Sequence, residues 1–283
     1  MRVAVVGLGG MGSRIAGRLL AAGHELVVWN RSPERMTPLV ERGATPAQSP
    51  RDAADGAEVV ITMVTDPDAL QAVTEGDDGI AAGARPGLIL VEMSTVGPAA
   101  IARLASALPE RADLVDAPVL GSLNEVESGS LSIFAGGSDE AVERVTPLLA
   151  NLGTVLRVGP TGSGARAKLV ANATLVGVIA VIGEAIALGR ELGLDDETIG
   201  NVLGRTALAE QAQRRLRAIG SNDYMPRFSL SLARKDADLI HDVTGRLRAI
   251  EAARSWLADA ESEGNGALDY SAVLATILKR SEP

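Results

Sequence analysis

A glycine-rich turn near the N-terminus restricts the fold of this chain more than any other feature. The apolar segment RVAVV at 2–6 leads directly into GLGGMG at 7–12, and a stretch rich in Ala, Leu and Arg follows. A G-x-G-x-x-G turn that joins a strand to a helix is typical of a parallel sheet that binds a dinucleotide. Gly7 makes the tight turn, Gly9 lets the backbone approach a pyrophosphate, and Gly12 lets the helix pack on the strand.

The whole turn is therefore predicted to contact the cofactor. The first N–H groups of a helix have no helical partner, so they are free to bind an anion. A turn that only packs is the alternative, but the strand before it and the helix after it favour binding. The predicted contacts are Gly7, Leu8, Gly9, Gly10, Met11 and Gly12.

The first half of the chain alternates strand-like and helix-like segments. The strand-like segments are short, apolar and rich in β-branched residues, and the stretch at 11–24 between the first two is helix-like. Continuous apolar strands separated by helices indicate a parallel sheet that is covered on both faces. The predicted strands are 2–7, 25–30, 58–64, 88–94, 113–119, 130–137 and 154–159.

The pattern changes after Gly164. From Ala165 to Leu194 apolar residues recur at helical spacing, which predicts one helix of about 30 residues and about 45 Å. Its apolar residues lie on nearly all faces, so burial on nearly all sides is expected. Further helices are predicted at 195–206, 209–221, 233–247, 248–264 and 270–280. The predicted fold class is α/β, with a Rossmann domain at 1–162 and an all-α domain at 163–283 that is built round the long helix.

Composition excludes several classes of protein. The 283 residues carry a net charge of −9, which argues against a general nucleic-acid binder, because such a protein needs a basic face. There is no cysteine, and the two histidines, His24 and His241, are too few for a typical zinc site, so no metal is expected. The N-terminus lacks the apolar core of a signal peptide, and the apolar run at 169–183 is short for a membrane span. These features favour a cytoplasmic protein without a membrane partner.

The end of the second predicted strand indicates which dinucleotide binds. A carboxylate at this point would hold a ribose 2′-OH, whereas a nearby arginine favours a 2′-phosphate. The chain has Asn30, Arg31 and Ser32 here, with Arg35 one helical turn later. A guanidinium binds a phosphate through two hydrogen bonds, so NADP(H) is predicted over NAD(H). A solvated Arg31 is the alternative, because arginine is common in this chain.

Two later strands are predicted to end at the same crevice. Ligands bind outside the carboxyl ends of parallel strands, and these ends are Val64-Thr65 and Ser94-Thr95. Ordinary capping of the following helices is the alternative interpretation, and it is compatible with cofactor contact.

One lysine is notable because the chain has so few. Only three of the 27 basic residues are lysines: Lys168, Lys235 and Lys279. Lys168 lies near the start of the long predicted helix, and Asn172 follows one turn later on the same face. Burial lowers the pKa of lysine from about 10.4 toward about 7–8, where the amine donates and accepts a proton, which arginine does not do. Lys168 is therefore the leading acid/base candidate, and a surface lysine is the alternative, although a helix N-terminus disfavours a cation.

Two further segments are weak signals when taken alone. The segment 116–137 contains Gly121 and Ser122, whose N–H groups and hydroxyl can hold a carboxylate or can simply form a tight turn. Lys235 and Asp236 lie on a later predicted helix, where they form an ordinary charged pair.

Four blocks, in this order, resemble the β-hydroxyacid dehydrogenases, which include 3-hydroxyisobutyrate dehydrogenase and glyoxylate/succinic semialdehyde reductase. The blocks are GLGGMG, DAPVLGS…GSLSIFAGG, GSGARAKLVAN and the late KD, and the resemblance covers nearly the whole chain. It implies a Rossmann domain, an all-α domain, and hydride transfer between a nicotinamide and a small hydroxy acid. By position it implies Lys168 as the acid/base, substrate contacts from Gly121, Ser122 and Asn172, and cofactor contacts from Val64, Thr65, Thr95 and Lys235. Ser94, at a strand end of the same crevice, is predicted as a further substrate contact.

The chain departs from the family pattern at two places, one that bears on the substrate and one that bears on the cofactor. The family often has Ser-Gly-Gly where this chain has Leu120-Gly121-Ser122. Gly-Ser resembles the glyoxylate/succinic semialdehyde branch, but Leu120 removes a hydroxyl and leaves the substrate undecided. Asn30-Arg31 replaces the acid of the NAD-using members, in agreement with the NADP(H) prediction.

Three other functions stay open at this point. An imine or ketone reductase of the same fold would bind the same cofactor. Imine reductases usually have another residue at the position of Lys168, so this lysine argues against that function. A non-catalytic NADP-binding protein would have no reason to hold Lys168 and Asn172 one turn apart. A decarboxylating phosphosugar dehydrogenase is less favoured, because no obvious basic cluster is available for a substrate phosphate. In each case a homodimer or homotetramer is expected, since a helix that is apolar on most faces suggests cover by another subunit.

Overall fold

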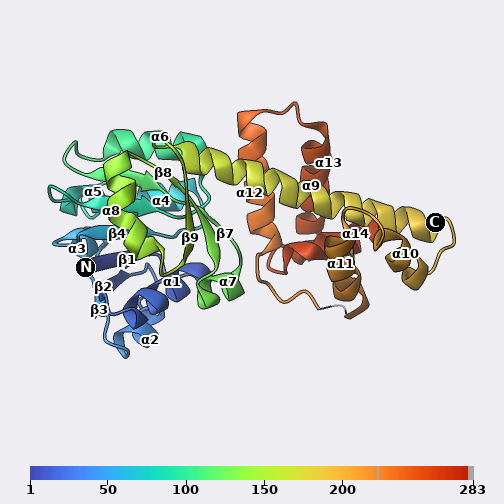
Figure 1. Ribbon diagram of the computed structural model, residues 1–283, viewed down its shortest axis with the longest axis horizontal. Coiled ribbons are helices and arrows are strands. Elements are labelled where there is room, and N and C mark those ends of the chain that lie inside the picture. The colour runs from blue at the N-terminus through green and yellow to red at the C-terminus, as the bar shows by residue number, and fades with distance from the viewer. Residues whose placement is uncertain (222, 280–283) are drawn as a thin grey trace. The chain divides into compact units, whose positions relative to one another are not determined.

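The computed structural model describes residues 1–221 and 223–279 (Figure 1). The chain divides into two compact units, Met1–Leu169 and Val170–Pro283. The first unit is α/β and the second is helical, so the predicted fold class is confirmed. A helix that links the two units, α9 (Ser163–Glu191), begins where the predicted domain boundary lies.

A mixed sheet forms the centre of the first unit. Its strands are β1 (Arg2–Val6), β2 (Glu25–Trp29), β3 (Thr45–Pro46), β4 (Val59–Thr62), β5 (Ile89–Glu92), β6 (Asp113–Asp116), β7 (Val119–Leu120), β8 (Leu131–Gly136) and β9 (Gly153–Gly159). They follow the order β3-β2-β1-β4-β5-β6-β8-β7, with β9 paired to β8. The six strands from β3 to β6 in this spatial order run parallel. The residues that follow β1, β2, β4, β5 and β6 therefore meet at one edge of the sheet.

Every predicted strand is present, but the prediction of a wholly parallel sheet is wrong at one side. β8 runs antiparallel to β6 and β7, and parallel to β9. A parallel pair needs a long crossover that returns the chain to the same end, and the chain between β7 and β8 contains only the short helix α7 (Leu123–Ser128). β3 and β7 have two residues each, too few to give a periodic pattern in the sequence.

Helices cover both faces of this sheet (Figure 1). They are α1 (Gly10–Ala21), η1 (Pro33–Arg35), α2 (Thr37–Val40), α3 (Pro50–Ala54), α4 (Pro67–Thr74), α5 (Ile80–Gly83), α6 (Gly97–Ala107) and α8 (Asp139–Leu149). Alternate residues of a strand point to opposite faces. Val5 packs in one core with Ile15 of α1 and Leu148 of α8, whereas Val6 packs in a second core with Leu104 of α6.

The long helix α9 has 29 residues, as its pattern predicts. By length and composition it could span a membrane, but 44% of its most apolar window is buried within the protein, and the core helix of a soluble protein passes the same test. The expectation of burial on nearly all sides is wrong for the single chain, because Val170, Val181 and Leu188 are 71%, 51% and 56% exposed. Their separations are close to whole numbers of helical turns, so they form one uncovered apolar face.

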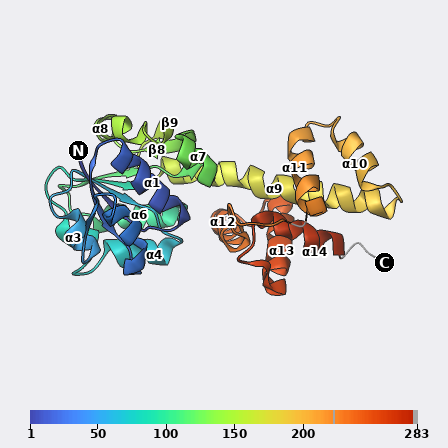
Figure 2. The same ribbon diagram turned by 90° about the horizontal axis from the view of Figure 1, so that it is seen from below.

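The second unit packs shorter helices round the later part of α9. They are α10 (Asp196–Leu203), α11 (Ala209–Ser221), α12 (Leu230–Val243), α13 (Arg248–Ala260) and α14 (Val273–Lys279), with η2 (Glu261–Asn265) and η3 (Tyr270–Ala272). In Figure 2, α10 and α11 lie on one side of α9, and α12, α13 and α14 on the other. Close approach depends on Gly183, where a Cβ would lie 2.7 Å from Ile277 Cδ1. The predicted later helices are confirmed, and Arg280, the predicted end of the last one, lies outside the described residues.

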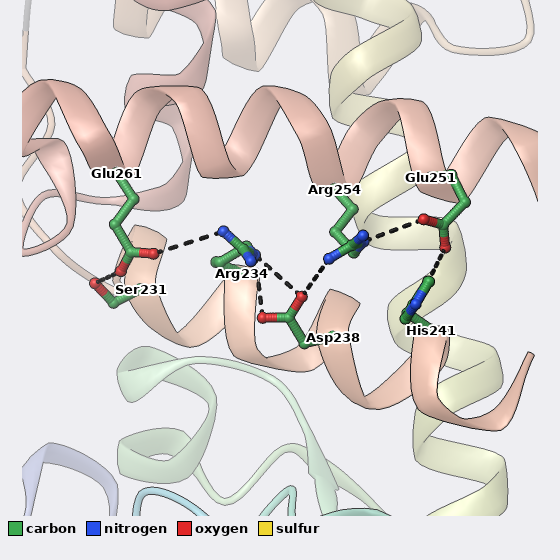
Figure 3. A network of polar contacts seen from close by, with 7 residues as sticks. All are labelled: Ser231, Arg234, Asp238, His241, Glu251, Arg254 and Glu261. Carbon is green, nitrogen blue, oxygen red and sulfur yellow. Dashed lines mark hydrogen bonds and ion pairs between the residues drawn. The ribbon is translucent and has the colours of Figure 1, made fainter. Parts of the chain in front are cut away.

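A line of charged side chains joins α12 to α13 (Figure 3). Asp238 accepts hydrogen bonds from Arg234 Nε at 3.1 Å and Arg254 Nη1 at 2.9 Å. Glu251 pairs with His241 Nδ1 at 2.8 Å and accepts from Arg254 Nε at 3.2 Å. The hydrogen bond with His241 lowers the pKa of Glu251. The members on α12 are three or four residues apart, so the network determines which face of α12 turns toward α13.

Candidate active site

The glycine turn has the shape that its sequence predicts. Gly7 has a φ of +96°, and a Cβ there would lie 2.3 Å from Met63 O. A Cβ at Gly12 would lie 2.0 Å from Gly7 O, so the start of α1 packs directly on the turn. By contrast, the Cβ position of Gly9 has no protein atom within 4 Å. The turn is therefore closed by protein at two glycines and open at the third, which fits a pyrophosphate that approaches at Gly9.

The start of α1 is suited to an anion. Its helical hydrogen bonding begins with Ser13 N–H donating to Gly9 O at 3.0 Å. The N–H groups of Gly10, Met11 and Gly12 come before this bond, and the first turn contains no acidic residue. The helix dipole and these N–H groups together favour negative charge at this point.

Asn30 holds the ends of the first two strands together. Its Oδ1 accepts a hydrogen bond from Leu8 N at 2.9 Å, and its Nδ2 donates to Ser32 O at 3.0 Å. Asn30 therefore supports the glycine turn, in addition to the cofactor contact predicted for it. Arg31 is exposed and Ser32 is half-buried at the same edge of the sheet, where a ribose is expected.

Ser94 ties the ends of β4 and β5 together. Its Oγ accepts a hydrogen bond from Val64 N at 2.8 Å, and its own N–H donates to Glu92 Oε2 at 2.9 Å. Ser94 and Glu92 are both buried. The predicted residues at these two strand ends are thus neighbours, as the parallel sheet requires.

None of the four residues named as possible helix caps, Val64, Thr65, Ser94 and Thr95, is the N-cap residue of the following helix. The N-cap of α4 is Asp66, whose side chain accepts from the backbone of the helix, and the N-cap of α6 is Val96. Thr65 and Thr95 each come one residue earlier, at the carboxyl edge of the sheet. Thr65 Oγ1 donates to the N-cap carboxylate, Asp66 Oδ2, at 2.8 Å, and the cofactor contact predicted for Thr65 and Thr95 stays a prediction.

The turn at Gly121 and Ser122 holds a carboxylate that belongs to the chain itself. Glu125 Oε2 accepts hydrogen bonds from Ser122 N at 2.7 Å and from Ser122 Oγ at 2.5 Å. The turn lies beside the glycine turn, because a Cβ at Gly10 would be 3.6 Å from Leu123 Cδ2. Ser122 is thus able to bind a carboxylate, but a substrate acid has to compete with Glu125 for its donors.

Lys168 lies near the start of α9, which is attached to the carboxyl edge of the sheet. Asp116, the last residue of β6, accepts hydrogen bonds from Gly162 N at 2.6 Å and Ala165 N at 2.7 Å. Burial raises the pKa of Asp116, and the bonds from Ala165 and Gly162 lower it in part. Lys168 is half-buried about one turn beyond Ala165. The first unit therefore contains the glycine turn, the Gly121-Ser122 turn and Lys168.

Asn172 and Lys235 belong to the second unit and meet at one acid. Asn172 Nδ2 donates to Asp236 Oδ2 at 2.6 Å, and Lys235 Nζ lies 2.8 Å from Asp236 Oδ1. Asn172 and Asp236 are buried. Asp236 therefore orients the amide of Asn172, which follows Lys168 by one turn on α9. Asn172 Oδ1 is buried with no hydrogen-bond partner in the described part of the chain, so it is suited to accept a hydroxyl hydrogen.

Other acid/base and metal candidates are weak. His24 precedes β2, at the amino ends of the parallel strands and thus opposite the glycine turn, and His241 is paired with Glu251. Within residues 1–221 and 223–279, no group of three or more His, Asp and Glu could hold a metal ion. A hollow of about 770 Å³ is lined by polar residues such as Arg51 and Arg85 and by none of the predicted site residues.

Known proteins match nearly the whole length of this chain. Residues 2–162 match the NAD binding domain of 6-phosphogluconate dehydrogenase, and residues 162–277 match the family described as NAD-binding of NADP-dependent 3-hydroxyisobutyrate dehydrogenase. The chain is 32% identical over 283 residues to 3-sulfolactaldehyde reductase of Escherichia coli, an alignment that covers 97% of this chain and 95% of that protein. The chain belongs to the β-hydroxyacid dehydrogenase family.

Two further relatives extend this result. This β-hydroxyacid dehydrogenase is 33% identical over 293 residues to 3-hydroxyisobutyrate dehydrogenase of Pseudomonas aeruginosa, with 96% of each chain covered. Its structure matches that of Mycobacterium tuberculosis 3-hydroxyisobutyrate dehydrogenase with L-serine at a TM-score of 0.88 and 25% identity, over 98% of both chains. The resemblance drawn from the four sequence blocks is confirmed, and the chain is an NAD(P)-dependent oxidoreductase of the β-hydroxyacid dehydrogenase type.

The sequence analysis gave no role to two acidic residues of the site, Asp116 and Glu125, and predicted a third, Asp236, only as the charged partner of Lys235, a pair that the structure contains. Asp116, Glu125 and Asp236 each bind a predicted site residue or the helix that carries one. Two of them left a signal in the sequence. Ser122 and Glu125 have the S-x-x-E spacing of a capping box, and Asp236 interrupts the buried apolar stripe of α12. Asp116 follows an apolar strand, and no local pattern predicts that its partners lie at the start of α9.

Proposed function

We propose that this chain transfers a hydride between NADP(H) and a small β-hydroxy acid or aldehyde acid, with Lys168 as the acid/base. The observation that carries the proposal is the position of Lys168, which lies in the same unit as the glycine turn and just beyond the anchored start of α9. Family membership supports the hydride transfer. A lysine carries a proton that it can donate to a carbonyl oxygen and take back from an alcohol, which an arginine cannot do.

The chain's own residues have the following parts in this mechanism. The glycine turn and Arg31 would hold NADPH, which would supply the hydride for the carbonyl carbon of the substrate. Lys168 donates a proton to the carbonyl oxygen, so that carbonyl, hydride and proton together give the alcohol. In the oxidative direction Lys168 removes the hydroxyl proton. Asn172, oriented by Asp236, holds the substrate beside Lys168.

The substrate is proposed to carry an acidic group. Relatives named for 3-hydroxyisobutyrate and 3-sulfolactaldehyde support this, because both compounds are anions. In this chain the turn at Gly121 and Ser122 offers donors for the acid, and Ser94 lines the same edge. Leu120 is 39% exposed next to the turn, which favours a substrate with an apolar part close to its acidic group.

The function is tested by following the oxidation of NADPH with a panel of carbonyl compounds. The panel contains glyoxylate, succinic semialdehyde, methylmalonate semialdehyde, and several bulkier ketones and imines, each also with NADH. We expect turnover with an aldehyde acid. Turnover with imines or bulky ketones alone would favour the reductase alternative, and tight NADPH binding without any turnover would favour a non-catalytic protein.

Arg31→Ala is expected to weaken the binding of NADPH without weakening the binding of NADH. Hydrogen bonds to a charged group contribute about 1.5–3 kcal/mol, so the Kd for NADPH should rise by about 10- to 150-fold. Fluorescence titration of both cofactors measures the change. Arg35→Ala, a variant one helical turn later, is the matched control and should have a smaller effect. An equal loss for NADPH and NADH would contradict recognition of the 2′-phosphate by Arg31.

Glu125→Gln is expected to lower the KM of an acidic substrate. The substitution keeps the size of the side chain but removes the negative charge beside Ser122, and like-charge repulsion of about 1 kcal/mol corresponds to a roughly fivefold change. kcat should stay the same, because Glu125 has no part in the hydride or proton transfer. Glu127→Gln, two residues later on α7, is the control. An unchanged KM would mean that the substrate acid does not dock at this turn.

We also propose that the chain forms a homodimer or homotetramer in the cytoplasm. The uncovered apolar face of α9 at Val170, Val181 and Leu188 supports a second copy as its cover, since exposed apolar patches mark association surfaces. Light scattering tests this, and a monomer at working concentrations would contradict it.

A further inference from the structure

We propose that Asp116 is a positioning residue for this reaction, which fixes the first turn of α9 and therefore Lys168. The inference rests on the proposed role of Lys168 as the acid/base. Asp116 is the last residue of β6 and is fully buried. A carboxylate in such a place is costly unless it is fully hydrogen-bonded, so its partners indicate what it does.

Both carboxylate oxygens of Asp116 bind the beginning of α9. Oδ1 accepts a hydrogen bond from Gly162 N at 2.6 Å, and Oδ2 accepts one from Ala165 N at 2.7 Å. The first N–H groups of a helix have no helical partners, and the helix dipole favours a negative charge beside them. Ala165 lies about one turn before Lys168, so this pair of bonds holds the turn from which the lysine side chain begins.

The first turn of α9 packs closely on the backbone of two strands. A Cβ at Gly164 would lie 2.2 Å from Asp116 O and 2.4 Å from Phe134 O. A Cβ at Gly136, on β8, would lie 2.7 Å from Asp116 Oδ1. The first turn of α9 is therefore in direct contact with the backbone of β6 and β8, and the two hydrogen bonds determine where along the strands it sits.

Asp116 also connects Lys168 to the substrate side of the site. The chain that leaves Asp116 forms β7, which pairs with β8, and then the turn at Gly121 and Ser122. One carboxylate thus holds the helix that carries the proposed proton donor against the strand that leads to the proposed acid-binding turn. A misplacement of about 1 Å between reacting groups can lower the rate by about 10²-fold. The hydrogen bonds of Asp116 therefore bear directly on catalysis.

The test compares Asp116→Asn with Ser138→Ala. The Asn side chain replaces one acceptor oxygen by an NH₂ group that faces a backbone N–H. Ser138 caps α8 in the same unit through Ala141 N, so Ser138→Ala removes a helix cap that has no link to Lys168. We expect Asp116→Asn to lower kcat by about 10- to 10²-fold, with the NADPH Kd changed by less than about twofold. Ser138→Ala should leave kcat unchanged, even if it lowers Tm by a similar amount.

A double-variant cycle separates positioning from stability. In a Lys168→Ala background, Asp116→Asn should cause no further loss of kcat, because the group that it positions is gone. An unchanged kcat in Asp116→Asn, or the same loss in both backgrounds, overturns the inference and leaves the role of Lys168 intact. Normal turnover in Lys168→Ala would instead overturn the proposed function, and this inference with it.

A second variant covers the case in which Asp116→Asn does not fold. Ala165→Pro removes the N–H donor to Oδ2 and keeps the buried carboxylate, and the first turn of a helix tolerates proline. It is expected to lower kcat with NADPH binding retained, and an unchanged kcat in this variant overturns the inference as well.

Discussion

Lys168→Ala is expected to lower kcat by about 10²- to 10⁴-fold while NADPH still binds, because the loss of a general acid/base removes the proton transfer and leaves the glycine turn intact. Lys168 lies on α9, whereas the predicted pyrophosphate site is formed by the start of α1. Steady-state kinetics on the substrate found in the panel gives kcat, and fluorescence titration gives the Kd for NADPH.

Two further lysine variants make this result specific. Lys168→Arg keeps a positive charge that does not titrate near neutral pH, so it should lose nearly as much activity as Lys168→Ala. Lys279→Ala changes an exposed lysine at the end of α14 and should be active. Substantial turnover in Lys168→Arg would mean that the position supplies charge and not a proton.

Two substitutions in the glycine turn are expected to impair different properties, stability in one case and NADPH affinity in the other. Gly12→Ala places a methyl group 2.0 Å from Gly7 O, so α1 must move away from the turn. Overpacking of this kind costs about 1–3 kcal/mol or more, which should lower Tm by several degrees. Gly9→Ala meets no protein atom within 4 Å, but alanine is less favoured than glycine at an N-cap, so stability should fall by no more than about 1 kcal/mol. The Gly9→Ala methyl group would instead occupy the space where a pyrophosphate approaches, and the Kd for NADPH should rise at least about tenfold.

Thermal unfolding and cofactor titration of the two variants measure these effects side by side. Gly9→Ala serves as the stability control for Gly12→Ala, because each variant adds one methyl group to the same turn. Unchanged NADPH affinity in a well-folded Gly9→Ala protein would contradict the approach of the cofactor at Gly9. Normal stability in Gly12→Ala would contradict the close packing of α1 on the turn.

The elements of this fold could be predicted because each has a local signal. The strand, glycine turn and helix at the N-terminus are adjacent in the chain, and the Cβ positions of Gly7 and Gly12 agree with the roles assigned to them. The apolar spacing after Gly164 predicted α9 almost to its ends. Parallel pairing then follows for β1 to β6, and it fails at β8, where the connection is too short for a crossover.

The candidate site was only partly predictable. Residue type and helical spacing proposed Lys168 and Asn172, which stay predictions, and the motif predicted the glycine turn, which has the expected shape. The long-range bonds of the acids were not predicted: Asp116 binds N–H groups of Gly162 and Ala165, and Asp236, predicted only as the partner of Lys235, also binds Asn172. Ser122 was predicted as a donor, and the structure adds that Glu125 uses that donor.

Local pattern alone was enough for the fold class and the family, because periodicity and short motifs reflect interactions between neighbours in the chain. Packing decided the rest. Contacts between residues far apart in sequence determine three features: the acid that binds the amide of Asn172, the face of α9 that stays uncovered, and the place where α9 packs on β6 and β8. Periodicity says that a face is buried, but the partner of that face is determined only when the elements come together.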